Sequence, residues 1–189
     1  MANFTKKAIV DSFYKLLVKK PFNQITVKDI VTDCGVNRNS FYYYFEDIPS
    51  LLADEISILS QNLMECYSNF DSIEEWLLHV LNIAKDNKKI IDNCIAHVDS
   101  SVSEKYLTKI FTHIISDHIE KSASVSNVSE SDKAIMVRLL IYQYIGFFHE
   151  WIKNGMRDDA VDSLKRMCYL QENTISQMIH NASKQEYDN

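Results

Sequence analysis

Residues that interrupt helices are scarce in this chain, which has three glycines and two prolines among its 189 residues. Sheet-rich folds with many tight turns need more of both, so the composition favours long helices joined by few sharp loops. We therefore expect an all-α fold. A chain of this length buries a sizeable core, either as one domain or as a small domain joined to a larger one.

Cysteine pairs with metal-binding spacing are also missing. Cys34, Cys66, Cys94 and Cys168 include no Cys-x-x-Cys motif and have no matching histidine cluster. This usage is typical of buried thiols in a reducing compartment, and the polar N-terminus lacks the apolar stretch that directs secretion. We expect a cytoplasmic protein.

Catalytic motifs are missing as well. The sequence contains no glycine-rich phosphate loop, no Gly-x-Ser-x-Gly and no His-Glu-x-x-His. His113 and His118 are five residues apart, which is out of register for two metal ligands on one helical face. We expect no enzymatic activity, no bound metal and no cofactor.

The most apolar stretch, residues 135–152, has 13 apolar or aromatic residues among 18. Its uncharged part, between Arg138 and Glu150, is 11 residues long, whereas a membrane helix needs about 20. We therefore expect no membrane partner. A helix that is apolar on all sides has to be buried on all sides, and Gly155 is a natural stop for it.

Residues 26–45 contain two short helical patterns joined at a glycine. Thr26 followed by Asp29 is typical of a capping box, so we expect a helix from Val27. Gly35 allows the chain to turn sharply after that helix. Asn37 is a favoured cap for the next helix. Together these signals predict a helix-turn-helix, in which one helix holds the other in the DNA major groove.

The second helix of this motif has an apolar face formed by Phe41 and Phe45, which lie about 40° apart at about 100° per residue. A tyrosine run in a generic helix packs in a core, but here the two phenylalanines occupy the inward face. The three tyrosines that follow Phe41 are therefore expected at the sides of the helix. Phenol groups there offer hydroxyl donors to phosphates and ring faces to thymine methyl groups.

A helix before this motif is expected to support it. Thr5 is a suitable cap for that helix, and Pro21 prevents its continuation. Its apolar stripe consists of Ile9, Phe13, Leu16 and Leu17.

Residues 1–50 contain seven Lys or Arg and five Asp or Glu, a balance of +2, whereas the remainder has 13 basic and 21 acidic residues, a balance of −8. A difference of this size also arises by chance, but it suits a DNA-binding N-terminal end.

The N-terminal sequence resembles the TetR family of bacterial transcriptional regulators. The resemblance lies in residues 25–30 (ITVKDI), residues 34–45 (CGVNRNSFYYYF) and the leucine pair at 51–52. It implies a helix-turn-helix DNA-binding domain at 1–48 and a helical ligand-sensing and dimerisation domain at 49–189. The residues that it places on DNA are Thr26, Lys28, Arg38, Asn39, Ser40, Tyr42, Tyr43 and Tyr44.

One position departs from the family pattern. Members usually carry a lysine three residues after the Phe45 position, where it contacts phosphate, but this chain has Ile48 followed by Pro49. Backbone amides at the start of the next helix are the alternative source of that phosphate contact.

The C-terminal part has the pattern of a helical seam over three heptad-like repeats. The seam consists of Val161, Leu164, Cys168, Gln171, Ile175, Met178 and Ala182. One helix with this seam and the apolar helix at 135–152 would bury each other across a twofold axis as a four-helix bundle, so we expect a homodimer. A core within one chain is the alternative. The family resemblance implies the same mode of dimerisation.

The family resemblance also implies control by an effector. Residues suited to line a ligand pocket are Trp76, His79, His97, Tyr106, His113 and Tyr142, each of which ordinary packing would explain equally well. We expect a repressor that a small molecule releases from an inverted repeat in double-stranded DNA. The alternative is an activator, or a module whose helix-turn-helix contacts protein, controlled by a protein partner. Residues 144–155 are similar to a TetR subgroup that includes an activator of dihydroxyacetone kinase genes, which responds through such a partner.

Overall fold

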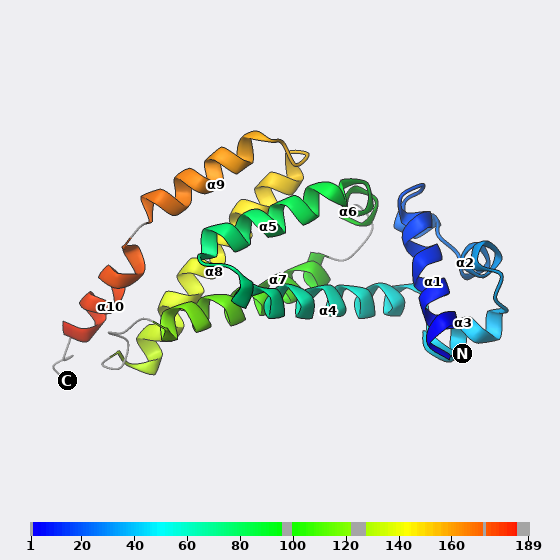
Figure 1. The fold of residues 1–189 in the computed structure, drawn as a ribbon, viewed down its shortest axis with the longest axis horizontal. Coiled ribbons are helices and arrows are strands. Elements are labelled where there is room, and N and C mark those ends of the chain that lie inside the picture. Colours follow the sequence, from blue (N-terminus) through cyan, green and yellow to red (C-terminus); the bar gives the residue numbers. More distant parts are fainter. Residues whose placement is uncertain (1, 96–99, 122–127, 172, 185–189) are drawn as a thin grey trace. The chain divides into compact units, whose positions relative to one another are not determined.

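The computed structural model describes residues 2–95, 100–121, 128–171 and 173–184, and within these ranges the regular elements are all helical (Figure 1). This confirms the predicted all-α class. The helices are α1 (Ala2–Leu17), α2 (Val27–Cys34), α3 (Arg38–Tyr44), α4 (Ile48–Cys66), α5 (Ile73–Asp86), α6 (Lys88–Ile95), α7 (Ser100–Glu120), α8 (Glu130–Lys153), α9 (Asp159–Leu170) and α10 (Thr174–Lys184). Short 3-10 turns occur at Phe22–Gln24 and Tyr67–Asn69.

The chain divides into two compact units. The first unit contains residues 1–59 and 84–103, and the second contains residues 60–83 and 104–189. The first unit therefore includes all of the expected 1–48 domain, and it adds most of α4 and the whole of α6. We call this first unit the head and the second unit the body.

The core of the head is built from α1, α2, α3 and the start of α4. Its buried residues are Ile9, Phe13, Leu17, Ile25, Ile30, Phe41, Phe45, Leu51 and Leu52. The predicted stripe on α1 is confirmed at Ile9, Phe13 and Leu17, whereas Leu16 is partly buried. The helix begins at Ala2, so the prediction of a cap at Thr5 was wrong. Residues 2–4 contain no glycine or proline that would stop the helix from extending to this point.

Helix α6 packs against this core from a distant part of the sequence. Ile90 and Cys94 contact the core cluster, and burial raises the pKa of the Cys94 thiol to about 11. The Asn93 side-chain amide donates to the backbone oxygen of Leu17 at 2.7 Å. This bond satisfies one of the free carbonyl groups at the C-terminal end of α1. Sequence patterns do not reveal such a pairing, because 76 residues separate its partners.

Aromatic rings fill the centre of the body. Trp76 of α5 and Phe111 of α7 meet edge to face at 5.9 Å, and Phe111 stacks on Tyr144 of α8 at 5.7 Å. Phe148 contacts Phe111 at 5.8 Å and Trp151 at 6.1 Å. All five side chains are buried. Ring pairs at these separations add to the stabilisation that burial itself provides.

Helix α8 is not covered on every side by its own chain. Ile135 and Leu139 are each 52% exposed and Tyr142 is 66% exposed, although the sequence predicts a helix buried all round. These residues recur at spacings of four and three, so they form one stripe on the helix. We call Ile135, Leu139 and Tyr142 the α8 stripe. The helix ends near the expected stop, where Gly155 has a left-handed φ of 80°.

The single C-terminal helix expected from the heptad-like seam is divided into α9 and α10 (Figure 1). The α9 helix ends with Gln171 as its cap, and Asn173 has a left-handed φ of 68°. Asparagine tolerates this conformation better than most residues. The helix is therefore interrupted here, although the heptad-like spacing of apolar side chains continues through this region. Leu164 is fully buried within its own chain, which corrects its expected place on a surface that faces a partner.

Candidate nucleic-acid interface

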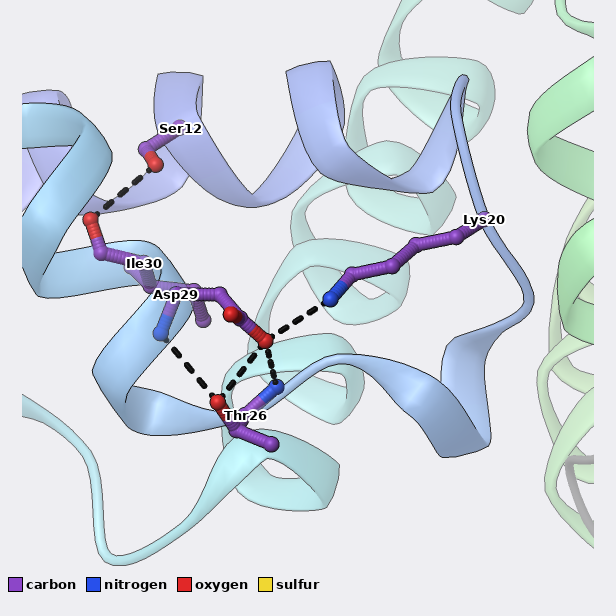
Figure 2. Close-up of polar contacts among 5 residues, drawn as sticks. All are labelled: Ser12, Lys20, Thr26, Asp29 and Ile30. Atoms are coloured by element: carbon purple, nitrogen blue, oxygen red, sulfur yellow. Dashed lines mark hydrogen bonds and ion pairs between the residues drawn. The ribbon is translucent and has the colours of Figure 1, made fainter.

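A reciprocal cap fixes the start of α2, as the sequence predicts. The Thr26 hydroxyl oxygen accepts from the Asp29 amide at 3.2 Å, and the Asp29 carboxylate accepts from the Thr26 amide at 2.9 Å. The Thr26 hydroxyl also donates to Asp29 Oδ2 at 2.7 Å (Figure 2). The Thr26 hydroxyl proton is therefore already used in a hydrogen bond within the cap. The family resemblance places this residue on DNA.

Charged and polar contacts attach α2 to α1 and to the turn that follows it. Lys20 Nζ lies 2.7 Å from Asp29 Oδ2, and Figure 2 shows it reaching the same carboxylate that caps the helix. Lys15 Nζ lies 2.6 Å from Asp33 Oδ1, one turn further along α2. The Ser12 hydroxyl, which is buried, donates to the backbone oxygen of Ile30 at 3.2 Å. These bonds set how α2 lies on the helix that supports it.

Hydrogen-bonding partners lower the pKa of both carboxylates of α2. The hydrogen bond from Lys20, followed by those from Thr26, lowers the pKa of Asp29 to about 2. The hydrogen bond from Lys15 likewise lowers the pKa of Asp33. Each carboxylate therefore neutralises a lysine of the head at physiological pH. This pairing reduces the positive charge that Lys15 and Lys20 offer to DNA.

The turn between α2 and α3 follows the predicted pattern. Gly35 caps α2 with a left-handed φ of 71°, a conformation that glycine adopts without strain. The Asn37 side-chain oxygen accepts from the Ser40 amide at 2.7 Å and from the Ser40 hydroxyl at 3.1 Å. Asn37 therefore caps α3 as expected. The Ser40 hydroxyl proton, however, is bonded within the chain.

The inward and outward faces of α3 are those that the sequence predicts. Phe41 is fully buried and Phe45 is 3% exposed, whereas Tyr42 is 48% and Tyr43 is 79% exposed. Tyr44 is half-buried and packs against the core of the head, where its ring meets that of Tyr43 edge to face at 4.9 Å. Tyr44 therefore supports its exposed neighbour.

The predicted DNA-binding residues thus form two groups. Lys28, Arg38, Asn39, Tyr42 and Tyr43 are exposed on α2 and α3. Thr26 and Ser40 use their hydroxyl protons within the chain, and Tyr44 packs on the core. The intrachain contacts at Thr26 and Ser40 belong to the caps of α2 and α3, whose cap residues are Thr26 and Asn37, so the capping signals in the sequence could have indicated them.

The start of α4 contains an apolar side chain where the family usually has lysine. Ile48 is partly buried and packs against the core of the head. The Asp47 carboxylate accepts from the Ser50 amide at 2.7 Å, and the Ser50 hydroxyl oxygen accepts from the Asp47 amide at 3.1 Å. This helix start therefore presents a carboxylate, and its Ser50 amide is already bonded. A phosphate contact through that amide would have to displace Asp47.

The residues proposed for a ligand pocket lie in different environments in the described part of the body. Trp76 is buried in the aromatic centre and donates from its indole nitrogen to the backbone oxygen of Leu63 at 3.0 Å. Tyr142 is exposed on α8. His79 packs on the Phe70 ring at 5.0 Å, and Tyr106 is half-buried. His97 lies outside the described residues.

His113 is exposed beside an open groove of about 640 Å³ between α4 and α7. The residues that line the groove are Gln61, Met64, Glu65, Lys109, Thr112 and His113. Its five other lining residues are not among those expected for the pocket.

Within the described ranges, we find no cluster of three or more histidine, cysteine or acidic residues that could hold a metal ion. The described helices also include none that is long and apolar enough to span a membrane.

A buried three-helix core whose second motif helix is capped and has an exposed outer face defines a helix-turn-helix. The family model described as "Bacterial regulatory proteins, tetR family" matches residues 9–54. The family model "Transcriptional regulator C-terminal region" of the same family matches residues 71–173, which is more than half of the chain. The chain belongs to the TetR family of transcriptional regulators, which are DNA-binding transcription factors and not enzymes.

The chain is similar to a Bacillus subtilis (strain 168) protein named uncharacterized HTH-type transcriptional regulator YdeS, at 23% identity over 113 residues. This match spans 57% of the length of that relative. The solved structure of the dihydroxyacetone kinase operon activator DhaS has a TM-score of 0.72 at 21% identity, covering 91% of this chain and 96% of that chain. A TetR transcriptional regulator from Streptococcus agalactiae 2603V has a TM-score of 0.55 at 19% identity, covering 86% and 94%. At these identities the solved structures show a shared fold.

The Asp29 contacts predict a change in titration when Lys20 is replaced by glutamine. The wild-type carboxyl should titrate near its pKa of about 2, and the Lys20→Gln variant should titrate closer to the ordinary value of 3.8. Because the folded-state pKa is lowered, the contribution of Asp29 to stability is present above about pH 4 and is lost as the pH falls towards 2. Carboxyl-detected NMR titration measures this directly. Lys19→Gln is the matched control, and equal Asp29 titrations in wild type and Lys20→Gln would contradict the assigned cause.

Proposed function

We propose that the chain acts as a cytoplasmic homodimer that binds an inverted repeat in double-stranded DNA and regulates transcription from it. The observation that carries this proposal is the outward face of α3, where Arg38, Asn39 and Tyr43 are exposed above two buried phenylalanines. A twofold dimer carries one such helix for each half-site. The two helices enter successive major grooves when they lie about one DNA turn apart, roughly 34–36 Å.

The exposed residues suggest a division of roles. Arg38, Asn39 and Tyr43 suit contacts with base edges, because arginine pairs with guanine, asparagine with adenine and an aromatic ring with the thymine methyl group. Lys28 suits phosphate or base. Thr26 and Ser40, whose hydroxyl protons are bonded within the chain, and Tyr44, which packs on the core, act in this proposal mainly by holding the two helices in place.

The α8 stripe and its neighbour α9 supply the proposed dimer surface. Exposed large apolar residues in a row mark surfaces that other proteins cover. Beside α8, an open groove of about 590 Å³ runs along α9, lined by Gln143, Asp162, Ser163, Arg166, Met167, Leu170 and Gln171. Val161, Cys168, Gln171, Ile175 and Met178 of the predicted seam are partly exposed and remain candidates for this surface. Leu164 is excluded because its own chain buries it.

The sequence favours a repressor released by a small molecule, and that mechanism needs a cavity in the body. The aromatic rings from Trp76 to Trp151 occupy its centre instead, and the two grooves described above are open. This packing favours the second candidate, in which a protein partner controls DNA binding from the surface. A protein with the same fold is named an operon activator. In this second candidate mechanism, the chain would therefore activate transcription instead of repressing it.

The DNA-binding proposal is tested by selection from a random DNA library with the full chain. We expect inverted repeats, and Arg38→Ala should lower discrimination at particular base pairs by about 1–3 kcal/mol. Lys28→Ala is the comparison, because loss of a phosphate contact would weaken all sequences alike and reduce the salt dependence of binding. Recovery of a single asymmetric half-site, or of no preferred sequence, would contradict the proposal.

The dimer proposal predicts that charges on the α8 stripe separate the subunits. Ile135→Glu combined with Leu139→Glu would place two unpaired carboxylates in a desolvated interface, each costing several kcal/mol. Sedimentation equilibrium should therefore show a dimer for the wild type and a monomer for this variant. Ile58→Glu, at a residue of similar exposure on α4, is the matched control and should stay dimeric. An unchanged dimer in the double variant would refute this interface.

The two control mechanisms predict different responses to fractions of a cell lysate. Operator binding by the purified chain should change by about 5- to 150-fold, the usual range of allosteric coupling, when the macromolecular fraction is added. The small-metabolite fraction should have no such effect, and protease treatment of the macromolecular fraction should remove its effect. Fluorescence polarisation of a labelled operator measures all three. Release by the small-metabolite fraction would restore the small-molecule mechanism.

A further inference from the structure

Two exposed side chains of α3 contact each other on the face proposed for DNA. Arg38 Nη2 donates to the Tyr42 hydroxyl oxygen at 3.4 Å, and the guanidinium carbon lies 5.8 Å from the centre of the Tyr42 ring. Residues four apart are neighbours on a helix, and side chains lean towards the N-terminus, so Tyr42 extends back over the turn that carries Arg38. Since the hydrogen bond is long, the attraction between the cation and the ring also contributes to the contact.

Tyr42 is itself held by the core of the head. Its ring meets the ring of Phe41 edge to face at 5.5 Å and 88°, and Phe41 is fully buried. A continuous set of contacts therefore runs from the core through Phe41 and Tyr42 to the guanidinium of Arg38. Arg38 is the first residue of α3, and the side-chain oxygen of Asn37, which precedes it, accepts from Ser40.

Ordering of the Arg38 side chain before DNA binds affects the free energy of binding, because this side chain is flexible. A free arginine carries about 2 kcal/mol of rotamer entropy, part of which is lost when the side chain contacts a base. A contact formed before DNA arrives reduces that loss. The guanidinium group has five N–H donors, so a bond to Tyr42 leaves enough donors for a bidentate contact with guanine.

We propose that Tyr42 is a positioning residue that orients Arg38 for base recognition, and that it thereby contributes to the sequence specificity of the protein. The proposal rests on the DNA-binding function proposed above. It differs in a measurable way from a direct contact between the Tyr42 hydroxyl and a phosphate, which the sequence predicts for the tyrosines of this helix. A phosphate contact strengthens binding to every sequence alike, whereas positioning acts at the base pairs that Arg38 contacts.

The test is a double-mutant cycle over an operator library with the full chain. Tyr42→Phe removes the acceptor oxygen and keeps the ring, and it should lower discrimination at the Arg38 base pairs about two- to tenfold, the cost of one unordered side chain. Tyr42→Leu removes the ring as well and should lower it further. In an Arg38→Ala background neither change should alter discrimination, because the residue that Tyr42 orients is gone.

Tyr43→Phe is the matched control, since it removes the same atom from the adjacent residue, whose ring contacts Tyr44. Its effect should be equally large with and without Arg38. The Tyr42→Phe variant keeps its packing on Phe41, and its thermal unfolding should match that of the wild type. Equal weakening of all sequences by Tyr42→Phe, in both backgrounds, would overturn the positioning role while the DNA-binding function stands. A wild-type chain without sequence preference would overturn both.

Discussion

The outward face of α3 depends on the burial of Phe41 and Phe45. The α3 helix spans only Arg38–Tyr44, and a helix this short is unstable in water because its first turn costs more than its few hydrogen bonds provide. Burial of each phenylalanine contributes about 1.5–3 kcal/mol, and the two rings also fix the rotation of the helix about its axis. Arg38 and Tyr43 face outwards as a consequence. The same two rings thus provide both the stability of the helix and the orientation of the face that we propose for DNA.

The acidic residues of α2 in the head also have more than one role, because they pair with nearby lysines. Asp29 caps α2, holds Lys20 and keeps its negative charge because its pKa is lowered. Lys15 is paired in the same way with Asp33. The basic residues of α2 and α3 themselves are Lys28 and Arg38. With so few cations on these two helices, the position of each one matters more than the total charge, which gives the contact between Arg38 and Tyr42 its importance.

The body combines a filled centre with an apolar outer stripe. Its buried rings contact one another from Trp76 to Trp151. The α8 stripe exposes apolar area that a folded protein usually covers. Both features are consistent with the proposal that macromolecular partners bind the surface of the body. The Asn93 bond to the end of α1 shows, in addition, that the head is built from two distant parts of the sequence.

Local signals were sufficient for the helix-turn-helix. Thr26 with Asp29, Gly35, Asn37 and the spacing of Phe41 and Phe45 each act within a few residues, so the sequence by itself determined the all-α class, the caps and the outward face of α3. Tertiary structure decided the rest. The packing of α6 on α1 and the burial of Leu164 depend on residues far apart in the chain, and the break before α10 arises where the left-handed backbone at Asn173 overrides a heptad-like pattern. Side-chain periodicity records which face of a helix is apolar, but it does not record which neighbour covers that face or where the backbone leaves the helix.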